Sequence, residues 1–456
     1  MTSDPVRWLW AAAAVALWLL TIAAAAFGRA RARRRAAARS ASRAGAADAD
    51  AVLVAFASQT GLAEQLAWMT ADALSAAGTA IRVAALGDLD ARGLRTAGRL
   101  LVVASTTGEG DAPDSLSRFV RRHMAAPADL AGLRYAVLAL GDRSYALFCG
   151  FGRALDAWLR RSGAEPLFDR VEVDDGDAGA VRHWQHQLAA VAGAPVAADW
   201  APPAFDRWRL VGRSRLNPGS PGGEAWLLAF EPVSHTPDWQ AGDIAEIGLP
   251  PVDGAPPASR EYSVASLPGD GRVELIVRRA IRDDGSPGLA SGWLTRELQP
   301  GDEVDMRLRT NRSFHGPAPA TPIVLIGAGT GLAGLRSHLR ARPEGGHGGA
   351  WLLWGERSPV HDAWLDAELQ AALAAGRLTR LDRVFSRAPG DGRYVQALVE
   401  QHADELRRWV DRGATLLVCG SLEGMSKGVH AALEQALGPD RVLELLETGR
   451  YRRDVY

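Results

Sequence analysis

The sequence predicts an α/β protein of several domains: a doubly wound domain, an antiparallel β-barrel and a second α/β domain, with one N-terminal transmembrane helix. Three observations lead to this prediction. The 456 residues are enough for about three domains of roughly 100–200 residues each. Continuous apolar runs at residues 51–56 and 322–326 are typical of strands buried on both faces of a parallel sheet. Between these runs, short strand-like segments alternate with Gly- and Pro-rich turns, as in a small antiparallel barrel.

The composition narrows the class of function. The net charge of −1 provides no basic field, which argues against nucleic acid as a partner. There are two cysteines, Cys149 and Cys419, far apart in the sequence. We therefore expect neither a disulfide scaffold nor a metal site, and the cysteine content favours a reducing compartment.

The N-terminal segment predicts a membrane anchor. Residues 8–28 hold no charged side chain, and at ~1.5 Å per residue about twenty residues cross the ~30 Å hydrocarbon layer. We place the transmembrane helix at residues 7–28 and a basic linker, which can also contact anionic lipid, at residues 29–49. The arginines of that linker predict a single-pass inner-membrane protein with its catalytic domains in the cytoplasm. The alternative, a cleaved signal peptide, has its positive charge before the apolar run.

Residues 50–192 form the first predicted domain. The apolar run 51–56 is a strand, and it ends in Ser58-Gln59-Thr60-Gly61. Apolar residues then recur at helical spacing from Leu62. A strand, a hydroxyl-rich turn and a helix N-terminus together make a site for an anion such as a phosphate group.

Two further strands of this domain, at 100–104 and 135–140, end in polar loops at 105–111 and 141–145. In an open α/β sheet, ligands bind beyond the carboxyl ends of the strands, where these loops and the first one converge. The three loops in this order resemble the flavodoxin domain of the diflavin reductases, the family of the sulfite reductase flavoprotein and the microsomal NADPH–haemoprotein reductase.

The resemblance implies that the first domain binds FMN. The residues implied for the FMN phosphate are Ser58, Gln59, Thr60, Gly61 and Ala63. Those implied for one face of the flavin ring are Thr106, Thr107 and Gly108, and those for the other face are Leu140, Gly141, Asp142, Tyr145 and Phe148. Microsomal members have a stacking tyrosine where this chain has Thr107, which leaves Tyr145 as the aromatic candidate for stacking.

Seven acidic residues gather on the same loops. They are Glu109, Asp111, Asp114, Asp142, Asp174, Asp175 and Asp177. One interpretation is a solvated acidic face, and the other is a docking surface that steers a basic redox partner.

Residues 193–204 form a predicted linker, and residues 205–318 the predicted barrel. Within it, Arg260-Glu261-Tyr262-Ser263 fits the Arg-x-Tyr-Ser signature of ferredoxin-reductase-like barrels that bind FAD. A guanidinium pairs with a pyrophosphate, a phenol covers the isoalloxazine, and a hydroxyl reaches the hydride-accepting nitrogen.

A glycine turn that opens a helix is the second FAD element of the predicted barrel, since helix amides bind a pyrophosphate. The residues are Gly288, Leu289, Ala290 and Ser291, and the resemblance adds Ile276 and Val277 as strand contacts. Only about ten residues separate Pro250 from Arg260, so the largely helical connecting domain of standard diflavin reductases has no room here.

Residues 319–456 form the predicted NADP-binding domain. The strand at 322–326 leads into a glycine-rich turn that contains Thr330 and suits a diphosphate. The resemblance implies that the remaining NADPH contacts, chiefly to the adenosine 2′-phosphate, are Arg357, Ser386, Arg387, Arg393, Tyr394 and Gln396. Arg393 takes the place of a family lysine that is Gly392 here, and Gly334 stands where the family has proline.

The resemblance also assigns roles to three residues near the end of the chain. The family's cysteine at the position of Cys419 lies beside the nicotinamide, and its closing Asp-Val-aromatic string matches Asp454 to Tyr456, whose ring covers the flavin. Ser263, Cys419 and Asp454 are thus the candidates for assisting hydride transfer, and Tyr456 should lie in the pocket that Ser263 lines. The alternatives are a small buried hydrophobe for Cys419 and a frayed end for Tyr456.

The function implied by this resemblance is that of an NADPH-dependent diflavin oxidoreductase. It would pass electrons from NADPH to FAD to FMN and on to a haem, iron or other metal centre at the cytoplasmic membrane face. The partners would be a redox acceptor protein or metal complex, and membrane lipid through residues 7–28. One alternative is the flavoprotein subunit of an NADPH sulfite reductase, which feeds a sirohaem subunit. The other is an anchored flavin-binding or scaffold protein without turnover.

Overall fold

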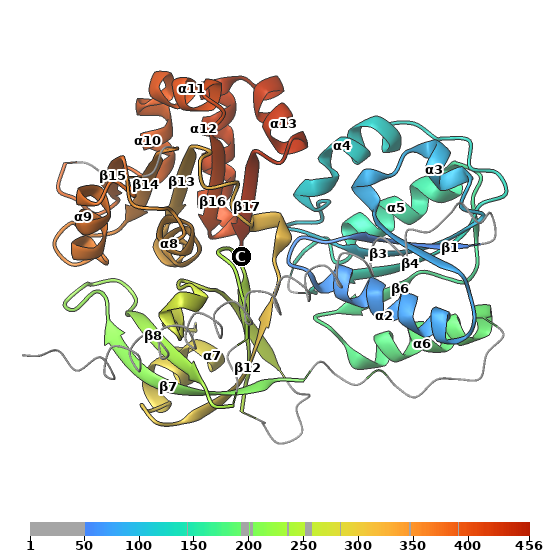
Figure 1. Cartoon of the computed structure of the whole chain (residues 1–456), viewed down its shortest axis with the longest axis horizontal. Coiled ribbons are helices and arrows are strands. Elements are labelled where there is room, and N and C mark those ends of the chain that lie inside the picture. The colour runs from blue at the N-terminus through green and yellow to red at the C-terminus, as the bar shows by residue number, and fades with distance from the viewer. Residues whose placement is uncertain are drawn as a thin grey trace, which may run out of the picture.

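The computed structural model describes residues 51–456 except 144, 193–199, 201–203, 235–236, 251–257, 283, 346–347 and 391. Three sheets follow one another along the chain (Figure 1). We call the parts around them the first domain (β1 to α6), the barrel (β7 to η6) and the last domain (β13 to β17).

The first domain is built on a parallel sheet with the order β2-β1-β3-β4-β5, in which β6 also pairs with β4. Its strands are β1 (Val52–Ala57), β2 (Ile81–Ala85), β3 (Arg99–Ser105), β4 (Arg134–Gly141), β5 (Glu165–Pro166) and β6 (Val171–Asp174). One face carries α2 (Leu62–Ala76) and α6 (Ala178–Ala192). The other carries η1 (Leu86–Asp88), α3 (Ala91–Arg95), η2 (Asp114–Leu116), α4 (Ser117–Phe119), η3 (Val120–Met124) and α5 (Gly150–Arg161).

The two helical layers follow from the alternation of side chains along buried strands. Leu53 and Ala55 of β1 belong to the core that includes α5, whereas Val52 and Val54 belong to the core that includes α2. Because both sets are apolar, the sheet is covered on both faces, as parallel sheets are.

The barrel is a six-stranded antiparallel sheet with the order β10-β9-β12-β7-β8-β11. Its strands are β7 (Asp206–Arg215), β8 (Ala225–Pro232), β9 (Ile244–Gly248), β10 (Ser259–Ser263), β11 (Val273–Arg278) and β12 (Glu303–Arg309). A bridge between Val264 and Leu275 joins the two edge strands and closes the barrel. The short helices are η4 (Pro268–Asp270), α7 (Leu289–Gly292), η5 (Trp293–Glu297) and η6 (Arg312–Phe314). Leu294 of η5 is fully buried in the barrel core.

Strands β9 and β10 are joined by a hairpin. They pair from Gly248–Ser259 to Ile244–Ser263, and the Leu249 amide donates to the Ala258 carbonyl at 2.8 Å. Part of the loop, residues 251–257, lies outside the described residues. A hairpin here is what the short spacing between Pro250 and Arg260 requires.

The last domain is a parallel sheet with the order β15-β14-β13-β16-β17. Its strands are β13 (Ile323–Ala328), β14 (Ala350–Glu356), β15 (Arg380–Phe385), β16 (Thr415–Gly420) and β17 (Tyr451–Val455). Its helices are η7 (Gly329–Gly331), α8 (Leu332–Arg340), α9 (Asp366–Ala374), α10 (Val395–Gln401), α11 (Ala403–Asp411), η8 (Leu422–Ser426), α12 (Lys427–Leu437) and α13 (Pro439–Glu447). Helices α10 to α13 cover one face, and α8, α9 and the barrel cover the other (Figure 1).

A buried ion cluster ties the barrel to the last domain. Arg336 of α8 donates to Glu274 of β11 at 2.6 Å, to the Ala265 carbonyl at 3.0 Å and to Glu368 of α9 at 2.8 Å. Burial alone would raise the pKa of Glu274, but its hydrogen bonds and ion pairs with Arg336 and Arg272 hold that pKa below the ordinary value. The barrel and the last domain therefore share one interface with satisfied charges.

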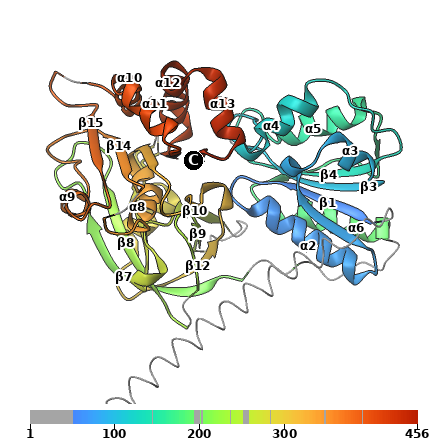
Figure 2. The ribbon, with the colours of Figure 1, turned by 45° about the horizontal axis from the view of Figure 1, so that its top comes forward.

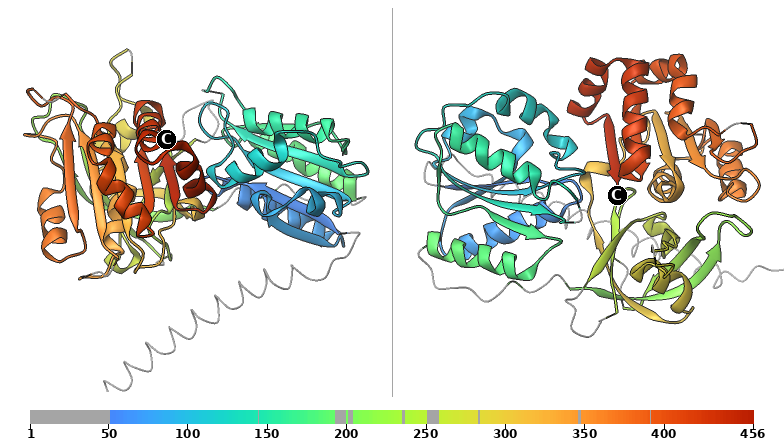
Figure 3. Two further views of the ribbon diagram at one scale, coloured as in Figure 1. Left: turned by 90° about the horizontal axis from the view of Figure 1, so that it is seen from above. Right: turned by 180° about the vertical axis from the view of Figure 1, so that it is seen from behind.

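The first domain lies beside both other parts (Figures 2 and 3). Helix α13 contacts α4 and η2 across this boundary. Three ion pairs of the described residues cross it, between Arg453 and Asp114, between Arg121 and Glu447, and between Arg312 and Glu64. In the described part of the chain, the first domain is thus placed by direct contacts.

The membrane prediction requires a correction. The proposed transmembrane helix at 7–28 and the basic linker at 29–49 lie outside the described residues. Within the described part of residues 51–456, no helix combines the length and the apolar character needed to cross a bilayer. The prediction of a single-pass inner-membrane protein is wrong on this finding. That prediction rested on the length and the lack of charge of residues 8–28 alone.

We predict that Arg336→Ala lowers the free energy of unfolding by about 3 kcal/mol, because it leaves the buried Glu274 carboxylate without its closest partner. Since the folded pKa of Glu274 lies below its ordinary 4.5, this stabilisation is present above pH 4.5 and is lost as the pH falls through the lowered pKa. Urea unfolding at several pH values measures both effects. Arg95→Ala, which breaks an exposed pair with Asp129, is the control and should change stability by less than about 1 kcal/mol.

Candidate functional site

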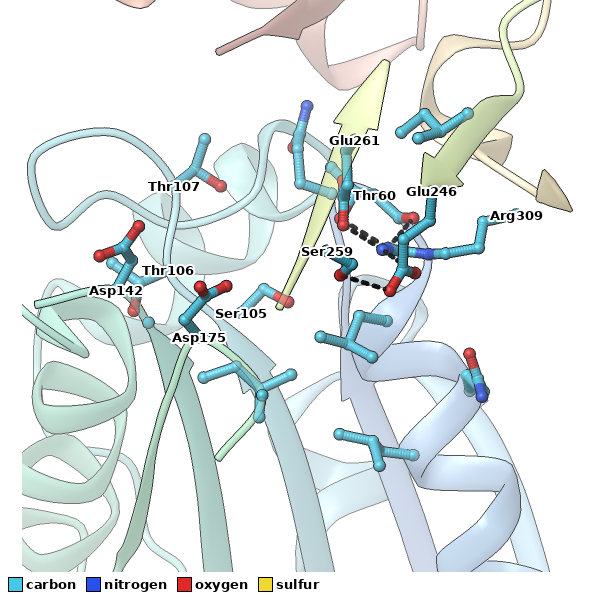
Figure 4. Close-up of a pocket in the computed structure, with 18 of the residues that line it drawn as sticks. Thr60, Ser105, Thr106, Thr107, Asp142, Asp175, Glu246, Ser259, Glu261 and Arg309 are labelled. Carbon is cyan, nitrogen blue, oxygen red and sulfur yellow. Dashed lines mark hydrogen bonds and ion pairs between the residues drawn. The ribbon is translucent and has the colours of Figure 1, made fainter. Parts of the chain in front are cut away.

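A cavity of about 800 Å³ lies where the three parts of the chain meet (Figure 4). Its walls are the loops after β1, β3 and β4, the strands β9, β10 and β12, and the end of β17. The predicted site residues that line it are Gln59, Thr60, Thr106, Thr107, Gly108, Leu140, Gly141, Asp142, Tyr145, Phe148, Tyr262, Ser263, Asp454 and Tyr456. Residues separated by hundreds of positions in the chain therefore form one site.

The loop after β1 has the geometry of an anion site. Gly61 takes a left-handed conformation with φ of 90° and caps α2, and its amide donates to the Ser58 hydroxyl at 2.9 Å. Ala63 is fully buried in the first turn of α2. The first amides of a helix have no intrahelical acceptor, so they are available to a phosphate group.

The loops after β3 and β4 leave polar groups without partners at the cavity. Within the described residues, the hydroxyl oxygens of Thr106 and Thr107 are buried and have no hydrogen-bond partner. A Cβ at Gly141 would stand 2.7 Å from the Cys149 amide nitrogen, so the β4 loop packs too closely for any side chain there. Unsatisfied hydroxyls on a cavity of this size fit a bound polar ligand of the size of a flavin mononucleotide.

Tyr262 and Ser263 of β10 face this cavity from the barrel side. Pairing with β9 sets their position, since Tyr262 lies opposite Ala245 and Ser263 opposite Ile244. Burial raises the pKa of Tyr262 to about 12, so its phenol stays neutral at physiological pH.

Ser263, Cys419 and Asp454 converge as predicted from the sequence. The Ser263 hydroxyl donates to Asp454 Oδ2 at 2.6 Å, and the Cys419 thiol lies 3.6 Å from the same oxygen and 3.9 Å from Ser263 Oγ. The parallel register of β16 and β17 causes this, because it places Cys419 opposite Asp454. Burial raises the pKa of Asp454. Burial, together with the neighbouring Asp454, also raises the pKa of Cys419 well above its ordinary value.

Tyr456 lies in the pocket that Ser263 lines. Its amide donates to the Gly420 carbonyl at 3.2 Å, and its hydroxyl donates to Thr330 Oγ1 at 2.8 Å. Thr330 belongs to the glycine-rich turn after β13, so the end of the chain connects this turn to the cavity.

Several predicted FAD contacts lie away from this cavity. Ile276 and Val277 are buried in the cores of the structure rather than on the cavity wall. The segment Gly288–Ser291 does open α7, and Ser291 Oγ accepts from the Ala280 amide at 3.0 Å. Arg260 is exposed and donates to the neighbouring Ser259 carbonyl at 2.7 Å.

The predicted 2′-phosphate residues gather at the carboxyl ends of β14 and β15. The Arg387 amide donates to the Arg357 carbonyl at 2.7 Å, and Ser386 is bound to the Glu356 carbonyl in the same way. Tyr394 is exposed at the start of α10, and Arg393 donates to Gln401 at 2.6 Å. The Gln396 amide oxygen is buried without a hydrogen-bond partner among the described residues.

Sequence reasoning missed three residues at the site. Arg309 of β12 reaches Thr60, Arg453 of β17 pairs with Asp114, and Gly334 of α8 lies against the Ser263–Cys419 contact. A Cβ at Gly334 would stand 3.1 Å from Cys419 Sγ. The departure from the family's proline was the only signal for Gly334, and nothing local marked the two arginines.

The acidic residues of these loops differ in what they contact. Asp114 pairs with Arg453 at the boundary between domains, and Asp174 pairs with Arg143 at 3.2 Å. Asp142 and Asp175 line the cavity. Asp114 and Asp174 thus serve contacts within the chain.

Two family models match parts of the chain. The model described as Flavodoxin matches residues 54–184, and the model described as Oxidoreductase NAD-binding domain matches residues 325–431. These ranges fall within the first and last domains.

Curated relatives match nearly the whole chain. The sulfite reductase (NADPH) flavoprotein alpha-component of Vibrio vulnificus (strain CMCP6) is 26% identical, over 88% of this chain and 87% of the relative. The same component of Cronobacter sakazakii (strain ATCC BAA-894) is 28% identical, over 88% of this chain and 89% of the relative. The alignment with the first extends over 538 positions, more than the 456 residues of this chain, so that relative has segments that this chain lacks.

We predict that both cysteines resist thiol reagents in the folded protein. Burial raises the pKa of Cys149 to about 11 and that of Cys419 well above its ordinary value, and only the thiolate reacts. At pH 8, a disulfide exchange reagent should react with few thiols of the native protein and with two thiols per chain in denaturant. Ser75→Cys, at an exposed position, should add one fast equivalent. Fast reaction of Cys419 in the native wild type would contradict the site geometry.

Proposed function

The chain belongs to the diflavin reductase family, and on that premise we propose an NADPH-dependent reductase that passes electrons through FAD and FMN to a one-electron acceptor. The observation that carries this proposal is the shared cavity. It joins the flavodoxin loops, the Tyr262–Ser263 segment of the barrel and the end of β17. Such an arrangement brings two flavin sites close together without an intervening domain.

Each cofactor has its own part of the chain in this proposal. FMN binds to residues 50–192, FAD to the ferredoxin-reductase-like barrel of residues 205–318, and NADPH to residues 319–456. When bound, NADPH supplies a hydride, FAD accepts it, and FMN delivers single electrons to the acceptor. The protein contributes binding, orientation and the exclusion of water.

The polar groups at the barrel end of the cavity orient one another. The Ser263 hydroxyl gives its proton to the hydrogen bond with Asp454 Oδ2, which fixes where its lone pairs point. The Cys419 thiol stays protonated because its pKa is raised, so it acts as a neutral packing group beside Asp454. Asp454 is the one acidic group of this trio whose charge can change during turnover.

The residues of the first domain would bind the phosphate and the ring of FMN. The amides of α2 and the hydroxyls of Ser58 and Thr60 hold the phosphate, whereas Thr106 and Thr107 offer their unsatisfied hydroxyls to the ring. Tyr145 lies on the cavity wall where an aromatic ring can stack.

The direct test separates the two flavin steps. Full-length protein should reduce both ferricyanide and cytochrome c with NADPH, and removal of FMN should abolish cytochrome c reduction while ferricyanide reduction persists. A protein that binds no flavin, or that reduces neither acceptor, would contradict the proposal.

A second candidate function is the flavoprotein subunit of an NADPH sulfite reductase. It is favoured by relatives that are named as this component and cover 88% of the chain. Co-purification with a sirohaem protein, and NADPH-driven sulfite reduction by the pair, would establish it. Unchanged activity after separation from every haemoprotein would favour a different acceptor.

We predict that Asp454→Asn slows NADPH-driven reduction of FAD by about 100-fold, because the charge beside Ser263 is lost. Stopped-flow absorbance with deuterated NADPH measures the step. Burial raises the pKa of Asp454, so its proton is lost at a higher pH than that of an ordinary Asp. The rate of FAD reduction by the wild type should rise as Asp454 ionises, whereas the rate of the variant should not change over the same pH range. FAD content should stay unchanged.

We also predict that Arg387→Ala raises the KM for NADPH at least about tenfold and leaves the KM for NADH nearly unchanged, because a charge-assisted contact to the 2′-phosphate is lost. Steady-state ferricyanide reduction with both nucleotides measures the difference. Arg408→Ala, on the exposed side of α11, is the control. An equal loss with both nucleotides would place Arg387 outside the 2′-phosphate site.

A further inference from the structure

We propose that the FMN phosphate site extends beyond the first domain: Arg309 of the barrel completes it by holding the Thr60 hydroxyl ready to donate to the phosphate. This inference rests on the FMN site of the proposed function. It adds a positioning residue from another domain, and it makes FMN affinity depend on the contact between the two domains.

Arg309 reaches the phosphate loop directly. Its Nη2 donates to the Thr60 carbonyl at 2.8 Å and to Thr60 Oγ1 at 3.1 Å (Figure 4). On its other side, Nη1 contacts the carboxylates of Glu246 and Glu261. The side chain is 7% exposed, so its position is fixed by these partners.

The direction of the hydrogen bonds gives Arg309 its role. A guanidinium can only donate, so Thr60 Oγ1 must accept from it. The hydroxyl proton of Thr60 is then free to donate elsewhere. The anion site formed by Ser58, Gly61 and the start of α2 belongs to the same loop, and an anion there needs donors.

The acidic neighbours of this loop are already paired. Glu246 and Glu261 line the same cavity as Thr60. Arg307 pairs with Glu246 at 2.6 Å, and Glu261 pairs with Arg309 and is partly exposed to solvent. Arg309 therefore acts on an anion at this loop chiefly through Thr60.

Neighbouring residues of the barrel touch the rest of the phosphate loop. The Ser313 hydroxyl donates to the Gln59 carbonyl, and the Thr310 carbonyl oxygen would stand 2.4 Å from a Cβ at Gly61. The segment Arg309–Ser313 thus contacts Gln59, Thr60 and Gly61 in turn. The conformation of the phosphate loop is set by the barrel as well as by α2.

The other explanation is that Arg309 only docks the two domains. A matched control is Arg312 in the same segment. It pairs with Glu64 at 3.0 Å, beside the phosphate loop, and so crosses the same boundary, but its side chain is exposed. If docking alone matters, the loss from Arg309→Gln is independent of the Thr60 hydroxyl and should add to the loss from Thr60→Val. If Arg309 acts through the Thr60 hydroxyl, the two losses should not add.

The test is FMN titration of full-length protein that has been freed of FMN but retains FAD, with flavin fluorescence as the readout. Arg309→Gln should weaken FMN binding by about tenfold or more, and Arg312→Gln by less than about twofold. FAD content should stay at one per chain in both. Because Arg309 acts through the hydroxyl, Thr60→Val should weaken FMN binding nearly as much as Arg309→Gln does. The double variant Thr60→Val/Arg309→Gln should then bind FMN about as tightly as the weaker-binding single variant.

The results of this titration test the role of Arg309 separately from the proposed reductase function. Equal FMN affinity in wild type and Arg309→Gln, additive losses in the double variant, or equal losses in the two arginine variants would overturn the inference while the reductase stands. Failure of the wild type to bind FMN would overturn the proposed function itself. If Arg309→Gln does not retain FAD, Arg309→Lys takes its place: its ammonium keeps the charge but lacks the planar fork that reaches Thr60 and the carboxylates together. An affinity between those of wild type and Thr60→Val is then expected, whereas wild-type affinity would overturn the inference.

Discussion

The hydrogen bond from Ser263 to Asp454 is the contact on which the rest of the site depends. It joins a barrel strand to the last strand of another sheet, across 191 positions of sequence. For it to form, β17 must pair with β16 in the observed register, and α8 must pack against the barrel. The Arg336–Glu274 pair holds that second interface, so charges far from the cavity determine whether its polar groups meet.

The phosphate loop of the first domain takes part in two kinds of contact. It has the hydroxyls and the helix start that an anion needs, and it also carries the contacts to Arg309 and Arg453. In a chain whose β9 and β10 are joined by a hairpin, no inserted domain stands between the described parts. Cofactor binding and domain placement therefore act on the same few residues, and thermodynamic linkage makes each depend on the other.

Local pattern was sufficient for much of the fold. The run 51–56 became β1 with a shift of one residue, 100–104 lies within β3, and the convergence of Ser263 with Asp454 followed from the family's motifs. Ile276 and Val277 were named from the resemblance alone; they lie on opposite faces of β11 and are buried in two different cores. Arg309 could not be found, since a pair between domains has no local spacing. The prediction for residues 7–28 rested on an uncharged apolar length, and that segment lies outside the described residues.

The position of β17 at the end of the chain also bears on synthesis. The first domain, with its flavin loops, is complete by α6 and can fold while the rest is still being made. Strand β17 is the last to join its sheet, and it carries the carboxylate that Ser263 requires. A nascent chain thus has the loops of the first domain before Arg309 of the barrel can reach Thr60 and before Ser263 can meet Asp454. The shared cavity is assembled only after β17 has been made.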